Sequence, residues 1–336
     1  SMVCLIAGII LLAAALIQDI SGSGAGWRGP ALIIGAIGIL LGMYLFPTLK
    51  HHRSIVNFIF VFPLLFTFVV TVIIPLCLGV FYSFTDWNGI KMTGFIGFAN
   101  YKAMFSEPSF LWSLIITILF VVLNMVLVNV VAFMLALLCT SKIKGLSFFR
   151  ASYFLPNLIG GIVLGYIWQF VFSRVFVSIG ETTGWSLFEI SWLSTPNKAF
   201  AALVLVSVWQ LAGYMILIYV AGFMGLSEDV LEAASIDGAS GWVKMKNIIL
   251  PLMMSSVTIC LFLTLSRAFM VYDVNLSLTG GAPYGTTEMA AMHVYEKAFT
   301  SRQFGVGQAE AFILFIIVAC ISGIQVYTTK KREVEA

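Results

Sequence analysis

Eight stretches of this chain lack charged residues and approach or exceed the length needed to cross the apolar core of a lipid bilayer. A spanning helix needs about 20 predominantly apolar residues, because a helix satisfies its own backbone hydrogen bonds away from water. The stretches cover residues 2–17, 30–46, 55–84, 111–139, 151–173, 199–226, 249–266 and 311–327. The sequence therefore predicts an all-α membrane protein with about eight transmembrane helices.

The overall composition supports lipid as the solvent of this chain. Hydrophobic residues make up 60% of the 336 residues and charged residues 10%, whereas a soluble protein carries roughly a quarter charged residues. The net charge of +3 is too small to predict a nucleic-acid partner. No Walker-type phosphate loop occurs, so the chain is not expected to hydrolyse ATP by itself.

Lysine and arginine positions predict the orientation, because short cytoplasmic loops carry an excess of both. Ten of the 18 basic residues fall in the segments 49–54, 141–150, 227–247 and 330–332. These segments all lie on one side if the predicted helices cross in turn. We therefore expect a multi-pass protein of a prokaryotic cell membrane with both termini in the cytoplasm.

Residues 227–251 differ from the other loops, because they read as two short helices at the cytoplasmic surface. Ser227 can cap the first helix and Ser240 the second. Gly238 can end the first helix in a left-handed conformation, which glycine adopts at the lowest cost. Pro251 follows where the chain re-enters the membrane.

The same segment resembles the EAA loop of ABC-importer permeases. The fixed positions that match are Glu232, Ala233, Ala234, Gly238, Ile248, Leu250 and Pro251. The resemblance implies a helix that docks in a groove on a separate ATPase subunit, with Glu232 facing a basic partner and the two alanines allowing close approach. The residues expected to couple the chain to the ATPase are Glu232, Ala233, Ala234, Asp237, Gly238, Leu250 and Pro251.

Further motifs resemble maltose-type sugar permeases. They lie at residues 83–88, 97–101, 149–156, 167–168, 279–283 and 305–311, and Ala282 departs from the family's TGGGP turn. The resemblance implies a six-helix permease core at residues 55–336, preceded by a pair of transmembrane helices at residues 1–54. The very large outer domain of some maltose permeases is missing.

The family resemblance also implies the assembly. The expected partners are a second permease subunit, two copies of an ATP-binding subunit and an extracytoplasmic solute-binding protein, together with membrane lipid and a sugar substrate. ATP and Mg²⁺ are expected on the ATPase subunits, with no cofactor and no enzyme activity in this chain. An oligosaccharide is the expected cargo, and glycerol-3-phosphate or another polyol phosphate is the alternative.

Polar residues at membrane depth are the candidates for the substrate path. Arg267 is embedded among apolar neighbours and either lines the path or extends to the outer headgroups. Thr264 shares its helix face, and Ser207, Gln210 and Tyr214 share a face of another predicted helix with Trp209 adjacent. Asn124 and Asn129 are expected to form hydrogen bonds between helices instead.

Two other functional classes are less well supported. An ion-coupled transporter needs an intramembrane carboxylate, and the eight predicted spans contain none. A membrane enzyme needs a convergent catalytic set, but His293 with Glu288 and Glu296 lacks the HExxH order and is expected on a solvated helix face. No metal site is predicted, because the pair His51-His52 indicates a basic loop.

Overall fold

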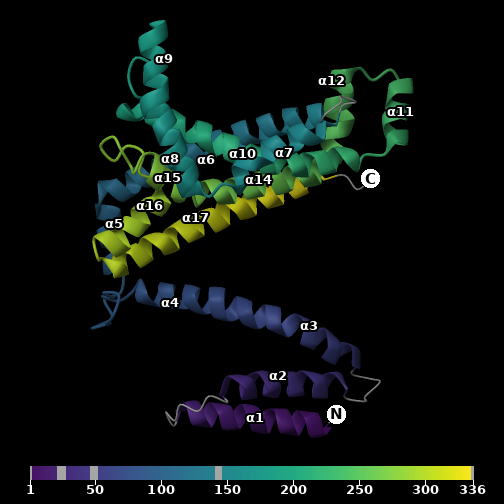
Figure 1. Cartoon of the computed structure of the whole chain (residues 1–336), viewed down its shortest axis with the longest axis vertical. Helices are drawn as coiled ribbons and strands as arrows, with labels where there is room; N and C mark the ends of the chain where they lie inside the picture. Colours follow the sequence, from purple (N-terminus) through teal and green to yellow (C-terminus); the bar gives the residue numbers. More distant parts are fainter. Residues whose placement is uncertain (1, 21–27, 46–51, 141–145, 334–336) are drawn as a thin grey trace. The chain divides into compact units, whose positions relative to one another are not determined.

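The computed structural model of the chain describes residues 2–20, 28–45, 52–140 and 146–333. Within these residues the regular elements are helices, and one isolated bridge joins Thr85 to Phe95. The predicted all-α fold class is confirmed. The chain divides into two compact units, Ser1–Gly79 and Val80–Ala336 (Figure 1). The predicted division after residue 54 is not decided by these contacts and stays a prediction.

The first unit is built on a close-packed helical hairpin. It contains α1 (Met2–Ile20), α2 (Arg28–Tyr44), α3 (His52–Phe68), the π-helical turn η1 (Val69–Ile73) and the start of α4 (Ile74–Tyr82). A β-carbon added at Gly8 would lie 2.7 Å from the backbone nitrogen of Ile39. One added at Gly42 would lie 2.6 Å from Cγ of Leu5. Small residues thus let the backbones of α1 and α2 approach closely.

The second unit contains the remaining helices. They are the rest of α4, α5 (Ala99–Ser106), α6 (Pro108–Cys139), α7 (Leu146–Leu158), α8 (Gly161–Phe170), η2 (Val171–Val175), α9 (Phe176–Thr183), η3 (Trp192–Ser194), α10 (Pro196–Met224), α11 (Glu228–Ile236), α12 (Gly241–Lys244), η4 (Met245–Ile249), α13 (Leu250–Leu252), α14 (Met254–Phe269), α15 (Asp273–Leu278), α16 (Ala290–Tyr295), η5 (Glu296–Thr300) and α17 (Phe304–Lys330).

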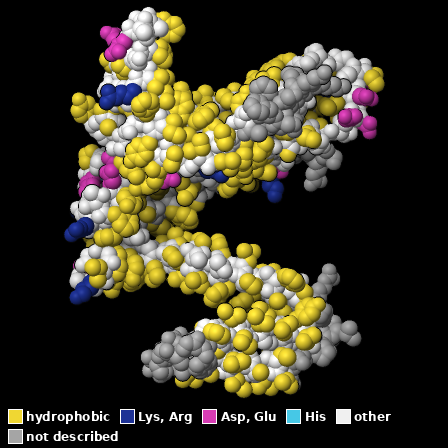
Figure 2. All heavy atoms as spheres, in the orientation of Figure 1, with side chains coloured by type: hydrophobic (Ala, Val, Ile, Leu, Met, Phe, Trp, Pro, Cys, Tyr) yellow, Lys and Arg dark blue, Asp and Glu magenta, His cyan; other side chains and the backbone are white. Residues whose placement is uncertain are grey.

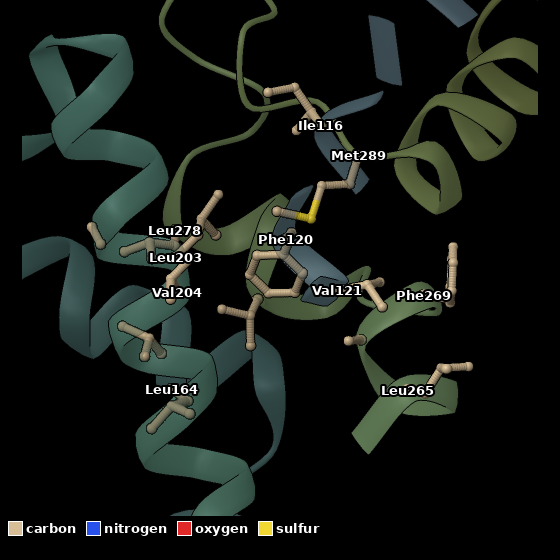
Figure 3. Close-up of a cluster of buried hydrophobic side chains, with 14 of the residues drawn as sticks. Ile116, Phe120, Val121, Leu164, Leu203, Val204, Leu265, Phe269, Leu278 and Met289 are labelled. Atoms are coloured by element: carbon tan, nitrogen blue, oxygen red, sulfur yellow. The ribbon is translucent and has the colours of Figure 1, made fainter. Parts of the chain in front are cut away.

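Helix α10 forms the centre of this unit, and α6, α7 and α14 pack against it. It is apolar around most of its circumference, as expected of a helix surrounded by other helices. Phe120 of α6, Leu203 of α10 and Leu265 of α14 are fully buried in the core cluster drawn in Figure 3. A second cluster continues the core toward α11 and includes Met215 and Cys260.

The two ends of the long helices carry different elements. Figure 1 shows α11 and α12 at one end of α10 and α14, and α5 and α16 at the other. The C-terminal end of α17 lies at the same end as α11 and α12. The predicted cytoplasmic segment and the basic tail therefore share one end of the unit.

Two predicted spans differ from the observed helices. The stretch 151–173 is broken at Ile159 and Gly160, so that α7 ends at Leu158 and a separate span runs from Gly161 to Thr183. The stretch 249–266 belongs to a bent pair, Gly241–Leu252 and Met254–Phe269, which meet at 72°.

A proline lies near each break, and Gly160 and Gly161 follow at the first. Pro156 precedes the first break and Pro251 lies just before the second, and proline removes a helical hydrogen bond.

Among the described residues, five helices are long and apolar enough to cross a membrane, or six if the bent pair is one span. The apolar helices Val3–Ala15 and Gly29–Tyr44 are shorter. The predicted count of eight is not confirmed.

Several of the outer motifs meet in one place. The side-chain amide of Asn100 donates to the backbone oxygens of Ser83 and Thr85, both at 2.8 Å. A β-carbon at Gly305 would lie 2.8 Å from that amide nitrogen. The motifs at residues 83–88, 97–101 and 305–311 therefore have a packing role: they join the end of α4, α5 and the start of α17.

Candidate functional site

The loop formed by α11 and α12 ends its first helix as the sequence predicts. Gly238 has a φ of +77°. Its N–H donates to the oxygen of Ser235 at 3.2 Å, and the N–H of Ala239 donates to the oxygen of Ala234 at 3.0 Å. This pair of bonds is the Schellman motif, which closes a helix with a left-handed glycine. Ser227 and Ser240 occupy the predicted cap positions, but their side chains form no capping hydrogen bond.

The outer face of this loop combines acidic and apolar side chains. Glu232 and Ala233 are exposed, whereas Ala234 is buried and faces the loop's own packing. Ile236 is 85% exposed and Trp242 is 76% exposed. Figure 2 shows acidic side chains gathered over α11. Sequence reasoning missed Ile236 as a candidate contact, although an apolar residue at the exposed end of a polar helix is a signal for one.

Lys244 fixes α12 against α11. Its ammonium donates to the backbone oxygen of Leu231 at 2.6 Å and contacts Oγ of Ser235 at 3.0 Å. The acceptors lie one turn apart in α11, Leu231 before its middle and Ser235 near its end. Lys246 is exposed two residues later. One lysine of the pair is thus part of the loop's internal structure and the other faces outward.

The loop continues directly into the two central helices. It begins after α10 and returns through α13 into α14, where Met253 at the bend is buried. Helices α10 and α14 are in close contact beside the loop, since a β-carbon at Gly222 would lie 2.4 Å from Oγ of Ser256. A displacement of the loop therefore acts on both helices together.

A polar cavity of about 350 Å³ lies toward the other end of these helices. Its lining residues include Asn157, Gly160, Gly161, Ser207, Gln210, Arg267 and Asp273. Arg267 donates to Oδ1 of Asn157 at 3.2 Å, and its guanidinium carbon lies 5.0 Å from the ring centre of Tyr214. The amide of Gln210 donates to the backbone oxygen of Ile159 at 3.4 Å. The break between α7 and α8 thus supplies one wall.

Four of the six residues predicted for the substrate path come together here. Ser207, Gln210 and Arg267 line the cavity, and Tyr214 contacts the guanidinium. Sequence reasoning missed Asn157, whose amide contacts the arginine, and Asp273, whose carboxylate lines the same cavity. The signal for Asn157 is its position after Pro156, where a helix interruption leaves polar groups at membrane depth.

The other two predicted residues lie elsewhere. Trp209 packs edge-to-face on Trp168 at 5.5 Å, beside a separate apolar cavity of about 700 Å³. Thr264 is buried and accepts from Nδ2 of Asn129 at 3.3 Å, while the hydroxyl of Tyr219 donates to Oδ1 of Asn129 at 2.8 Å. Asn129 therefore joins α6, α10 and α14, as predicted.

The interhelical role predicted for Asn124 is not found. Its amide nitrogen donates to the oxygen of Phe120 in its own helix at 2.9 Å. Its Oδ1 is buried and has no hydrogen-bond partner among the described residues.

The histidine predicted on a solvated helix face is buried, and that prediction is wrong. His293 is 7% exposed, because α16 packs against α6 and α17. Its Nδ1 lies 2.7 Å from Oε1 of Glu288, and its Nε2 lies 3.6 Å from Oε1 of Glu310. Burial lowers the pKa of His293, but the two carboxylates outweigh burial and raise that pKa to about 9.

Glu310 corrects a second expectation. It lies in α17, whose observed start at Phe304 is earlier than the predicted stretch 311–327. Its side chain is fully buried. The spanning helices therefore do contain an acidic residue. The predicted stretch missed it because that stretch began at residue 311, one position after Glu310.

Residues 146–334 match the family described as binding-protein-dependent transport system inner membrane component. The match covers more than half of the chain and includes the α11–α12 loop and the cavity residues from Asn157 to Asp273. The chain belongs to this family. The predicted resemblance to the permease subunits of binding-protein-dependent ABC importers is confirmed, and the protein is a membrane permease of that family.

Curated relatives extend the likeness beyond the family segment. The permease is 46% identical to the probable starch degradation products transport system permease protein AmyD of Thermoanaerobacterium thermosulfurigenes, over 82% of this chain and 94% of AmyD. It is 32% identical to the sn-glycerol-3-phosphate transport system permease protein UgpA of Rhizobium meliloti, over 74% of this chain and 84% of UgpA.

A solved structure supports the same fold. The permease matches a chain of a bacterial ABC transporter involved in the import of the acidic polysaccharide alginate, with a TM-score of 0.73. The match covers 84% of this chain and 97% of that chain at 17% identity. At this identity the likeness establishes the arrangement of the helices.

Proposed function

We propose that this permease subunit translocates a sugar, delivered by a solute-binding protein, across a prokaryotic cell membrane and is driven by separate ATPase subunits. The observation that carries this proposal is the 46% identity to AmyD over nearly the whole of that relative. AmyD is named for starch degradation products, so an oligosaccharide is the proposed cargo. Translocation is a binding and conformational process, and the permease itself performs no covalent chemistry.

The cavity chemistry supports a neutral sugar over a polyol phosphate. Arg267, Gln210 and Asn157 offer hydrogen-bond donors and acceptors to hydroxyl groups. Asp273 lines the same cavity and would repel a phosphate dianion while accepting from a sugar hydroxyl. Because UgpA is named for sn-glycerol-3-phosphate transport, a polyol phosphate is the second cargo to test. Tyr214 lies behind the cavity wall, where its ring contacts the Arg267 guanidinium and orients that group.

The α11–α12 loop is the proposed coupling element. ATP and Mg²⁺ bind the two ATPase subunits, whose closure pulls on the exposed face around Glu232 and Ala233. Because the loop joins α10 to α14, which contact each other, the displacement moves Ser207 and Arg267 together relative to Asn157 at the α7–α8 break. The cavity then alternates between access from the two sides, as in other transporters that rock one helix group against another. A second permease subunit completes the path.

The proposed orientation places α11, α12 and both termini in the cytoplasm. Lys244, Lys246, Lys330 and Lys331 lie in segments that Figure 1 draws at one end of the unit, in agreement with the positive-inside rule. Lys50, Arg53, Lys142, Lys144 and Arg150, also used in the prediction, have side chains outside the described residues.

Uptake by the reconstituted complex tests the proposal. The permease, its second subunit, the ATPases and the binding protein are placed in proteoliposomes with ATP inside, and uptake of labelled maltooligosaccharides is measured. We expect uptake that requires both ATP and the binding protein. Excess glycerol-3-phosphate should not compete with it.

Two results would contradict the proposal. Uptake of glycerol-3-phosphate without uptake of any saccharide would favour the phosphate alternative. Uptake that collapses with a proton or sodium gradient at constant ATP would remove the ATPases from the mechanism.

A further inference from the structure

Three ionisable side chains from distant parts of the sequence converge at the end of the permease opposite the α11–α12 loop. They are Glu107 at the start of α6, His293 in α16 and Glu310 in α17. One ligand atom of each lies within 4.8 Å of the others. The transport mechanism described above uses none of them.

Glu310 is the least expected member of this group. Its side chain is fully buried, and neither carboxylate oxygen has a hydrogen-bond partner among the described residues. Nε2 of His293 is also buried without a hydrogen bond, and it lies 3.6 Å from Oε1 of Glu310. Buried polar groups in native proteins are nearly always satisfied. Two facing groups that both lack a hydrogen bond therefore indicate a missing partner between them.

The opposite side of the imidazole is held by a carboxylate. Nδ1 of His293 lies 2.7 Å from Oε1 of Glu288. An ionised carboxylate only accepts, so Nδ1 donates its proton to Glu288, and Nε2 is the ring nitrogen that faces Glu310. Metal-binding histidines almost always donate their other N–H to such a partner, which fixes the ring and its tautomer. Phe110 packs near the ring, with centroids 5.9 Å apart.

We propose that Glu107, His293 and Glu310 form a binding site for a divalent transition-metal cation of the Zn²⁺ class. Imidazole nitrogen and carboxylate oxygen are both Zn²⁺ ligands, and water can complete the tetrahedron around three protein donors. Donor atoms about 2.1 Å from a tetrahedral ion lie roughly 3.4 Å apart. The Nε2–Oε1 distance of 3.6 Å already matches, and rotation of the Glu107 side chain closes the remaining separation.

Lys297 is the competitor for this site. Its ammonium lies 2.6 and 2.5 Å from the two oxygens of Glu107. A bound ion takes over the role of that ammonium as the counter-charge, and Lys297 turns toward solvent. The ion would also displace the proton on Nε2 of His293, because a histidine binds a metal through a deprotonated nitrogen.

The site would tie together the outer ends of three helical segments. Its three donors are separated by 186 and 17 residues along the chain, as the numbers of Glu107, His293 and Glu310 give. Such a link would hold α16 against α6 and α17 while the coupling end moves. Its proposed role is structural and does not depend on which substrate the permease carries.

Titration of Zn²⁺ into the full-length permease, purified in its complex after treatment with a chelator, tests the site. We expect about one additional Zn²⁺ per permease compared with the His293→Gln complex. Glu310→Gln and Glu107→Gln should each weaken this binding at least roughly tenfold, and Glu288→Gln by about 10–100-fold. Glu107 is partly exposed, so its variant leaves the buried packing intact. X-ray absorption should show only nitrogen and oxygen donors near about 2.0–2.2 Å.

Two matched controls separate this site from other Zn²⁺ ligands. Glu296→Gln changes a neighbouring glutamate outside the proposed donor set, and His51→Asn with His52→Asn removes the other two histidines. Both variants should keep the additional Zn²⁺. Sulfur donors at about 2.3 Å would assign the ion to cysteines and overturn the proposal. Equal affinity in the Glu310→Gln and wild-type complexes would overturn it as well.

Discussion

The α11–α12 loop and the segment around α15 and α16 lie at opposite ends of the same helices. The loop leaves apolar side chains exposed, whereas the other segment buries polar ones. At the loop, Ile236 and Trp242 are largely exposed although they are apolar. At the other end, Asn275, His293 and Glu310 are buried although they are polar. Exposed apolar groups mark a docking site for a protein partner, whereas buried polar groups need fixed neighbours. Asn275 finds them in Thr279, Thr287 and Met289, and Glu310 would find one in the proposed ion. The first end is therefore built to bind, and the second is built to hold its shape.

Placing a charge on an exposed isoleucine at each end is the strongest test of this difference. Ile236→Asp puts a carboxylate in the proposed ATPase contact, where burying an unpaired charge is costly. We expect ATPase association to weaken about 100-fold or more, with transport lost. The measurement is co-purification of the ATPase subunits with the permease.

Ile90→Asp is the matched control for that test. Ile90 is 83% exposed in the loop after α4, away from α11 and α12. ATPase co-purification should be unchanged in this variant. Equal loss in both variants would mean that the effect is one of folding, and equal retention would remove Ile236 from the contact.

A substitution in the cavity should give the reverse pattern. Arg267→Lys keeps the charge but loses the planar fork that reaches Asn157 and covers Tyr214. We expect the KM for saccharide uptake to rise roughly tenfold, the value of one hydrogen bond to a charged group. ATPase co-purification should be unaffected.

Arg174→Lys controls for the loss of an arginine as such. Arg174 is exposed in η2 and does not line the cavity. Its substitution should leave KM unchanged. If Arg267→Lys also left KM unchanged, the guanidinium would belong to the headgroup region and the substrate path would lie elsewhere.

Lys244 and Lys246 provide a finer test within the coupling end. Lys244→Met removes the bonds to Leu231 and Ser235 that fix α11 against α12. The ATPase should still bind, but transport per ATP hydrolysed should fall roughly two- to fivefold, because the loop yields when it is pulled. Lys246→Met, at an exposed position, should leave this ratio unchanged. Loss of ATPase binding in both variants would instead indicate direct contacts by the lysines.

Local sequence patterns predicted the elements that depend on local chemistry. Gly238 ends α11 because its left-handed backbone closes the Schellman motif. The hydrogen bonds of that motif join residues close together in the sequence. Ser207, Gln210 and Tyr214 share one face of α10 because their spacing follows the helical repeat. Both features are independent of the rest of the fold.

The missed features depend on which helices meet. Spacing placed Thr264 on the face of Arg267, but it could not show that Asn129 of α6 reaches Thr264 first. Trp209 is adjacent to Gln210 in the sequence, but this position could not show that its side chain packs on Trp168. The burial of His293 requires α6 and α17 to close over α16, and no local pattern encodes that contact.

The smallest expected effect concerns α14, which connects the two ends. Thr264→Val preserves shape but removes the acceptor for Asn129, which still donates to the oxygen of Met125 at 2.8 Å. Hydrogen bonds between membrane helices average about 0.6 kcal/mol, so unfolding should become easier by about that amount in detergent. Thr258→Val, on the same helix, loses only a bond to its own backbone and should change less. The KM for uptake should stay at its wild-type value, because Thr264 is buried against Asn129 and out of reach of the substrate. A changed KM would place Thr264 on the substrate path. Helix α14 would then line that path along its length, instead of contributing to the binding site at one end only.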